Sequence, residues 1–148
     1  MDAPTLPDYR TLAELRYQIR RFLRFSEDAA RKAGIEPHQH QLLLAIKGLP
    51  ENYQPRIGIL AERLQIQPHS AVELANRLAR AGYVRRKRDS EDGREVLLSL
   101  TVKGERLLRR LSLDHRAELQ TAGPRLMAAL RRIAASKARG NGKKTRKS

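Results

Sequence analysis

Residues 56–104 constrain the fold more than any other part of the chain, because they combine two short helical patterns with a charged β-hairpin. The segment reads RIGILAERLQIQPHSAVELANRLARAGYVRRKRDSEDGREVLLSLTVKG. Residues 57–64 and 68–81 have the apolar spacing of short helices, and two extended runs follow with an acidic, glycine-containing turn between them. This order predicts a winged helix–turn–helix in which the hairpin is the wing.

Amphipathic helices are expected on both sides of this segment. The first runs from about Asp8, as its N-cap, to about Ala33. Its apolar stripe consists of Leu12, Leu15, Ile19, Phe22 and Ala29. A helix this long exceeds what a small winged-helix core can cover, so we expect part of the stripe to pack on a second copy of the chain. The alternative interpretation is an ordinary amphipathic core helix.

Proline, glycine and threonine mark the ends of the other helices. Pro37 fits the first position of a helix that Gly48 ends. Thr101 is the expected N-cap of the helix that follows the hairpin. Gly123 and Pro124 are expected to break or kink that helix before a last amphipathic helix. The predicted class is therefore mainly α with a small β-hairpin wing, a winged helix–turn–helix with N- and C-terminal dimerisation helices.

The formal net charge of +15 over 148 residues indicates a polyanionic partner. Aromatic residues make up only 4% and Trp is absent, which disfavours readers of RNA or single strands by base stacking. The lack of cysteine excludes disulfides, thiolate zinc sites and thiol redox sensing. No apolar run approaches the roughly 18 residues of a membrane span, and the N-terminus lacks signal-peptide features. We expect a cytoplasmic, nucleoid-associated protein with double-stranded DNA as partner.

Three regions follow from these patterns. Residues 1–7 are an N-terminal arm, and residues 8–136 are a winged-helix domain with dimerisation helices. The DNA-binding part of that domain covers about 37–104. Residues 137–148 carry many basic side chains and no apolar cluster, so they are expected to form a disordered basic tail.

Residues 68–81 are the expected recognition helix. Its inward positions are Ala71, Leu74, Ala75 and Leu78. Its outward positions, the candidate DNA contacts, are His69, Ser70, Val72, Glu73, Asn76 and Arg77. Such a helix fits the major groove, where these side chains can reach base edges and phosphates. Glu73 has a second interpretation, an ion pair with Arg77 one helical turn away.

The predicted wing is strongly cationic. Its basic residues are Arg85, Arg86, Lys87, Arg88 and Arg94. A cationic hairpin beside a recognition helix can follow the phosphate backbone and place one arginine in the minor groove, and Arg94 is the candidate for that role. Asp89 and Asp92 are expected to structure the wing by pairing with Arg94 or Arg88 and by accepting turn amide hydrogens. The alternative is that the basic run is only a solvated face.

The sequence resembles the MarR family of bacterial transcriptional regulators. The matching segments are LAERL (60–64), SAVELANRLARAGYV (70–84), RRKRDSEDGR (85–94) and LSLTVKG (98–104). The resemblance covers residue 8 to about 136 and implies a homodimer with interleaved terminal helices that presents two winged helices to a pseudo-palindromic site. It also implies a wing motif, here Asp92 and Arg94, whose arginine reaches the minor groove. Members of the family commonly act as repressors that release DNA when a small, often phenolic anion binds.

Two positions depart from the family pattern. Gly93 stands where the family usually has a second wing arginine, so the wing tip is expected to bind less tightly. Gln65 stands in the turn between the two helices, where the family often has glycine.

Candidate effector residues follow from the resemblance and their placement. Family effectors bind in a crevice between the first, second and fifth helices, and we expect one histidine, His38 or His40, to face it with Arg16, Tyr17 and Arg20. The two histidines are two residues apart, so on a helix they cannot chelate a metal as an i, i+4 pair would. We expect no metal and no cofactor. A glycine-rich phosphate loop and a nucleophile elbow are both missing from the sequence, so we expect no enzymatic activity.

Two functional interpretations remain open at this stage. The first is a dimeric, sequence-specific regulator, acting as a repressor on double-stranded DNA. The second is a nucleoid-associated architectural protein with little sequence preference, which the basic tail and the high charge favour because charge supplies nearly all non-specific affinity. The shaped recognition helix and wing favour the first.

Overall fold

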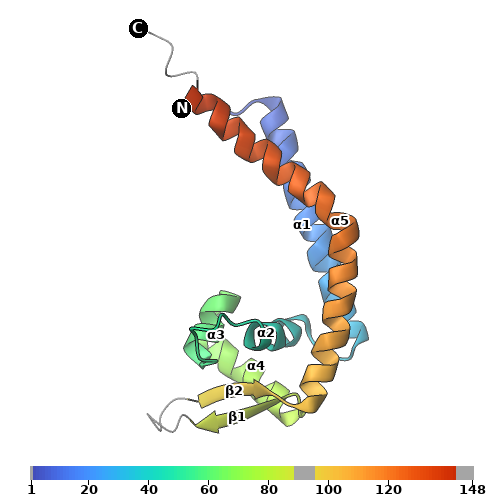
Figure 1. The fold of residues 1–148 in the computed structure, drawn as a ribbon, viewed down its shortest axis with the longest axis vertical. Coiled ribbons are helices and arrows are strands. Elements are labelled where there is room, and N and C mark those ends of the chain that lie inside the picture. Colours follow the sequence, from blue (N-terminus) through green and yellow to red (C-terminus); the bar gives the residue numbers. More distant parts are fainter. Residues whose placement is uncertain (1, 89–95, 143–148) are drawn as a thin grey trace. The chain divides into compact units, whose positions relative to one another are not determined.

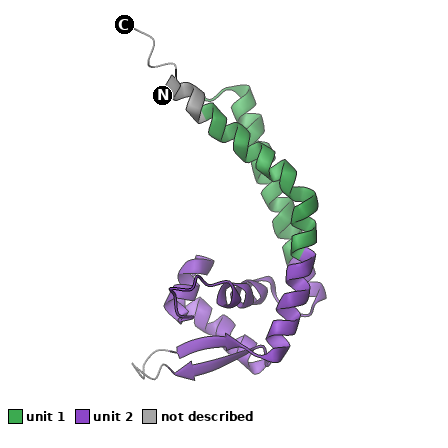
Figure 2. Cartoon of the chain, viewed as in Figure 1, with its two compact units in different colours: residues 1–26, 115–148 green, residues 27–114 purple. Residues whose placement is uncertain are grey.

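The computed structural model describes residues 2–88 and 96–142, with side chains described as far as Ser136. The elements in chain order are α1 (Leu6–Lys32), α2 (Pro37–Lys47), α3 (Ile57–Leu64), α4 (Pro68–Arg80), β1 (Val84–Arg88), β2 (Val96–Leu100) and α5 (Val102–Gly142) (Figure 1). The predicted class, mainly α with one β-hairpin, is confirmed. The chain forms two compact units (Figure 2). We call residues 27–114 the winged-helix unit, and residues 1–26 with 115–148 the helical unit.

Helix α1 begins before Asp8, which the sequence analysis wrongly assigned as its N-cap. Thr5 occupies the capping position instead. The Thr5 backbone N–H donates to Asp8 Oδ2 at 2.9 Å, and the Asp8 N–H donates to Thr5 Oγ1 at 3.4 Å. This reciprocal pair is a capping box, and it places the Asp8 carboxylate in the first turn, where the helix dipole favours negative charge. At the other end α1 stops at Lys32, and Gly34 follows with a φ of 88°.

The core of the winged-helix unit draws side chains from every element in the unit. Its buried members are Ala30, Ile35, Leu42, Leu43, Leu60, Ala75, Leu78, Val84, Leu98, Leu107, Leu108 and Leu111. Helix α2 contacts both α3 and α4, which also contact each other. The predicted inward face of α4 is confirmed, because Ala71, Ala75 and Leu78 are buried and Leu74 packs against the core. The opposite face of α4 is therefore turned toward solvent.

The wing is an antiparallel ribbon whose register runs from Val84 opposite Leu100 to Arg88 opposite Val96. Arg56 forms an isolated bridge with Leu97, so the connector before α3 flanks β2 on the side away from β1. Thr101 caps α5 as predicted, since its hydroxyl oxygen accepts the Gly104 N–H at 3.1 Å. The hydroxyl of Thr101 also donates to the Gly82 carbonyl at 2.6 Å, which ties the end of β2 to the start of β1.

Helix α5 is one continuous helix and contains Pro124, so the predicted separate last helix is wrong. A proline inside a helix removes one backbone hydrogen bond and costs about 3 kcal/mol. Packing of this part of α5 along α1 within the helical unit can offset such a cost, because tertiary packing supplies most helical stability in proteins. The helix extends to Gly142, past Lys137, where the sequence analysis placed the start of the tail. Residues 143–148 lie outside the described part.

Within the helical unit, α1 and α5 run antiparallel, as two contacts near their ends show. His115 Nε2 lies 2.8 Å from Ser26 Oγ, and the Ser136 hydroxyl donates to Asp8 Oδ1 at 3.0 Å. Phe22 meets the His115 ring edge-on, with ring centroids 6.0 Å apart. The hydrogen bond from the Thr5 backbone, together with those from the Ser136 and Thr5 hydroxyls, lowers the pKa of Asp8.

Gln65 ends α3 with a left-handed backbone, φ 55° and ψ 45°, at the position where the family often has glycine. Its side-chain nitrogen donates to the Glu62 carbonyl at 2.8 Å and to Glu62 Oε1 at 3.0 Å. Left-handed geometry costs a residue with a Cβ about 1–2 kcal/mol.

We therefore expect Gln65→Gly to be more stable than Gln65→Ala by about 1 kcal/mol, because both lose the Glu62 bonds and only glycine relieves the backbone. Urea unfolding of the two variants at equal protein concentration measures the difference. Greater stability of the alanine variant would show that the turn is not held in this conformation.

Candidate nucleic-acid interface

The solvent face of α4 carries the residues predicted to contact DNA. His69, Val72, Glu73 and Arg77 are exposed, and Ser70 and Asn76 are half-buried beside them. Val72 keeps 42% of its surface accessible, which is a large exposure for a β-branched apolar side chain and suits contact with a thymine methyl. These six side chains are thus brought to one surface, while their roles toward DNA remain predictions.

The start of α4 presents a positive helix end. Pro68 occupies the first helical position, and the N-cap residue Gln67 makes no side-chain capping hydrogen bond. A helix N-terminus attracts phosphate through its free N–H groups and its dipole. Because α3 packs against α4, the helix–turn–helix holds this end of α4 in a fixed position. A phosphate contact here would set the register of the helix along a duplex.

Strand β1 adds four cations to the surface of the winged-helix unit. Arg85, Arg86, Lys87 and Arg88 are all exposed, and only the preceding Val84 of this strand is buried. None of the four is paired with a carboxylate among the described residues, where the one ion pair is Lys47–Glu105 at 3.0 Å. Within the described part of the chain, the strand therefore presents four cations without a carboxylate partner, as a phosphate-binding surface does.

The ribbon register divides these cations between two faces. Arg86 lies opposite Leu98, which is 1% exposed, so Arg86 shares the core-side face of the ribbon. Arg85 lies opposite the exposed Ser99, so Arg85 and Lys87 share the outer face. Arg94, the predicted minor-groove residue, lies outside the described residues, and so do Asp89 and Asp92.

Two features of this surface were missed in the sequence analysis. Arg80 is exposed one turn beyond Asn76 and donates from Nε to the Asn76 carbonyl at 3.4 Å, which extends the basic end of α4. Arg80 follows Asn76 by four residues, about one helical turn, and this spacing in the sequence could have predicted that the two lie side by side. Lys103 donates to the Ala81 carbonyl at 2.7 Å and lies 4.5 Å from the Tyr83 ring centroid. This contact joins α5 to the C-terminus of α4, and no local pattern in the sequence predicts it.

The predicted effector residues are divided between the two units. Arg16, Tyr17 and Arg20 lie exposed on α1 in the helical unit, where the Arg21 guanidinium stands 5.8 Å from the Tyr17 ring centroid. The other two candidates are on α2 in the winged-helix unit. His38 is exposed and His40 is buried, with 3% of its surface accessible. The assignment of these five residues to an effector pocket stays a prediction.

Among the described residues, no three His, Asp or Glu side chains gather as they would around a metal ion. None of the helices in residues 2–88 and 96–142 has an apolar stretch that could cross a membrane.

Comparison with known proteins identifies this architecture. The sequence model of the MarR family matches residues 33–95. Among solved structures, AbsC, a MarR family transcriptional regulator from Streptomyces coelicolor, is 19% identical with a TM-score of 0.72, and the match covers 93% of each chain. PcaV, a transcriptional regulator from the same organism, is 25% identical with a TM-score of 0.56, over 84% of this chain and 96% of PcaV.

A DNA complex is also among the similar structures. A single-residue mutant of MepR from S. aureus, bound to an oligodeoxyribonucleotide, is 18% identical with a TM-score of 0.62, over 82% of this chain and 93% of MepR. No curated protein matches the sequence. The fold is that of MarR winged-helix proteins, and the resemblance to the family inferred from the sequence is confirmed.

Proposed function

We propose that this chain, whose residues 33–95 match the MarR family, is a transcriptional repressor that binds a pseudo-palindromic operator in double-stranded DNA as a homodimer. The observation that carries the proposal is the surface of the winged-helix unit. There the solvent face of α4 exposes side chains that could contact base edges, and β1 exposes four cations that have no carboxylate partner in the described part of the chain. Release of the operator by a small aromatic anion belongs to the same proposal on the strength of the resemblance alone. The absence of enzymatic activity also belongs to it, because the sequence lacks a glycine-rich phosphate loop and a nucleophile elbow.

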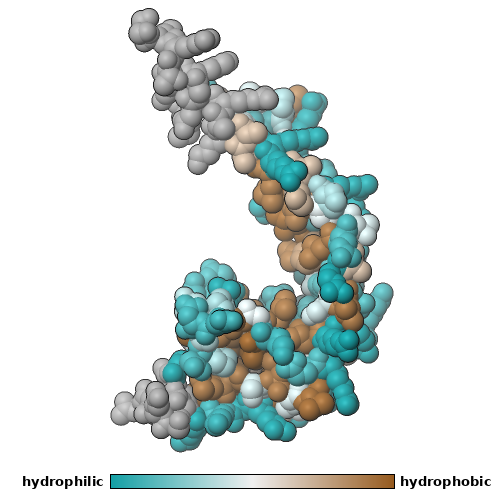
Figure 3. Space-filling view, in the orientation of Figure 1, coloured by the Kyte–Doolittle hydropathy of each residue, from teal (hydrophilic) through white to brown (hydrophobic). Residues whose placement is uncertain are grey.

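The homodimer is supported by apolar side chains that the helical unit leaves exposed (Figure 3). Those with at least 40% of their surface accessible are Leu6, Tyr9, Leu12, Tyr17, Ile19, Leu23, Leu119, Met127 and Leu130. The predicted apolar stripe of α1, part of which was expected to pack on a second copy of the chain, contributes Leu12 and Ile19 to this set. Exposed apolar groups gathered on two helices mark an association surface, and a second copy of the same surface is the partner we propose.

Selection of bound sequences from a random duplex pool at near-physiological salt tests the function. An inverted repeat with half-sites about one helical turn apart is expected from a dimeric regulator. A flat or merely AT-rich profile would favour the architectural alternative, which the net charge of +15 keeps under consideration.

The same selection with the variant Asn76→Ala tests whether this residue contacts a base. Asn76 lies half-buried on α4, where a bidentate contact to one adenine would contribute about 1–3 kcal/mol of discrimination. We expect the variant to lose preference at one base position of each half-site and to keep the rest of the motif. Arg131→Gln, an exposed change on α5, is the control and should select the wild-type motif. An unchanged motif with Asn76→Ala would remove this residue from base readout.

A further inference from the structure

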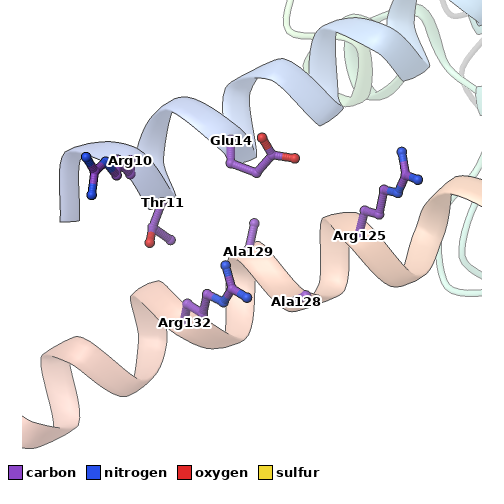
Figure 4. Close-up of a pocket in the computed structure, with 7 residues that line it drawn as sticks. All are labelled: Arg10, Thr11, Glu14, Arg125, Ala128, Ala129 and Arg132. Carbon is purple, nitrogen blue, oxygen red and sulfur yellow. The ribbon is translucent and has the colours of Figure 1, made fainter. Parts of the chain in front are cut away.

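The helical unit contains a polar groove that the proposed function does not use. It has a volume of about 470 Å³ and is lined by Arg10, Thr11, Glu14, Arg125, Ala128, Ala129 and Arg132. The first three residues come from α1 and face the other four, which come from α5 (Figure 4). All seven belong to the helical unit, and none was a candidate in the sequence analysis.

The groove has an excess of positive charge. It contains three guanidinium groups and one carboxylate, and none of the three arginines has a carboxylate within 4.0 Å among the described residues. Glu14 is engaged elsewhere, because its Oε1 accepts a hydrogen bond at 2.9 Å from the amide of Gln18, a side chain only 4% exposed. That bond fixes Glu14 in place and leaves its second oxygen as an acceptor. As far as the described residues go, the guanidinium groups are therefore donors without an anionic partner.

Small side chains make room between the arginines. Arg125 and Arg132 are seven residues apart, so they lie on one face of α5 about 10 Å apart along its axis. Ala128 and Ala129 occupy the space between them, and Ala129 is 3% exposed and forms the floor. The Thr11 hydroxyl donates to the Pro7 carbonyl at 3.0 Å, which leaves its oxygen as an acceptor toward the groove. The α5 side of the lining is thus cationic at two separated points, and the α1 side adds Arg10 and two acceptors, Thr11 and Glu14.

We propose that this groove binds a small organic dianion that also carries a hydroxyl group, of the hydroxydicarboxylate class. Guanidinium groups bind carboxylates through paired, charge-assisted hydrogen bonds, and the two arginines of α5 are spaced for a ligand with an anionic group at each end. Glu14 and Thr11 then accept the hydrogen of the ligand hydroxyl. A plain dianion would leave these acceptors unused, and a cation would meet only one carboxylate.

Calorimetric titration at constant ionic strength tests the site with malate and succinate, which differ by one hydroxyl. Malate is expected to bind the wild-type protein more tightly than succinate. In R125Q/R132Q the affinity for malate should fall at least about tenfold, since both charged donors are lost. The matched control is R116Q/R131Q, which removes the same charge from exposed positions of the same helix outside the groove and should bind within about twofold of wild type.

The variant E14Q separates the two parts of the proposal. It should bind succinate at least as tightly as wild type, because a like charge is removed, and its preference for malate should be smaller than that of wild type, because a charged acceptor is replaced by a neutral amide oxygen. Three results would overturn the proposal. One is no heat of binding for either dianion with wild type, and another is equal losses in the groove variant and its control. The third is a dimer weakened in R125Q/R132Q while wild type binds no dianion, which would assign these arginines to the contact between copies.

Discussion

Replacing Arg85, Arg86, Lys87 and Arg88 together by glutamine is expected to lower affinity for duplex DNA by at least about 10³-fold at near-physiological salt. Each cation that neutralises a phosphate releases counterions, so log K changes with log salt by about 0.9 per contact. All four side chains are exposed, and none has a carboxylate partner among the described residues, so we expect each to be able to contact a phosphate. Fluorescence anisotropy across a salt series should show a slope reduced by about three to four per protomer.

The matched control changes four exposed arginines of α5, Arg109, Arg110, Arg116 and Arg131, to glutamine. It removes the same net charge away from the wing and should lose far less affinity. Two double variants, R85Q/K87Q and R86Q/R88Q, then compare the two faces of the ribbon at equal charge. Equal losses in the wing variant and the α5 control would mean that total charge, and not the wing, drives binding. That result would support the architectural alternative.

Local patterns in the sequence predicted the winged-helix unit of this fold well. The spacing of Ala71, Leu74, Ala75 and Leu78 predicts which face of α4 is buried, because helical periodicity alone decides it. Pro37, Pro68 and Thr101 mark helix starts through backbone chemistry that depends on few neighbours. Once the buried faces and the helix ends are known, the solvent-exposed face of α4 and the position of the β1 cations can be predicted without knowledge of contacts between distant residues.

One helix start and several features that depend on distant residues were missed or wrong. Asp8 was predicted as the N-cap of α1, but Thr5 takes that position, because competing local hydrogen bonds decide where a helix begins. Pro124 is a helix breaker by propensity, yet the helix continues through it beside α1. The arginine groove was missed because Arg10 and Arg132 are more than 100 residues apart. Their sequence neighbourhoods look like ordinary solvated helix faces.

Gly104 shows how a long-range contact can decide the identity of a residue. It is buried in the first turn of α5, and a Cβ built on it would overlap the carbonyl oxygen of Tyr83 and lie 3.1 Å from its carbonyl carbon. The same carbonyl accepts the Thr101 N–H at 3.1 Å, so the start of β1 and the start of α5 are held together there. A side chain at this position must push the two elements apart. The wing leaves the core at this junction.

We expect Gly104→Ala to lower the free energy of unfolding by about 2–4 kcal/mol, as overpacking against an immobile backbone does. Gly123→Ala is the matched control in the same helix, because nothing lies within 4 Å of the added carbon. There alanine should stabilise by about 0.5–1 kcal/mol through lower chain entropy. Urea unfolding of both variants should be measured at the same protein concentration. Any dependence of stability on dimer formation then affects both in the same way. Equal stability of the two variants would show that α5 and β1 do not meet at Gly104, and the wing would then need another anchor.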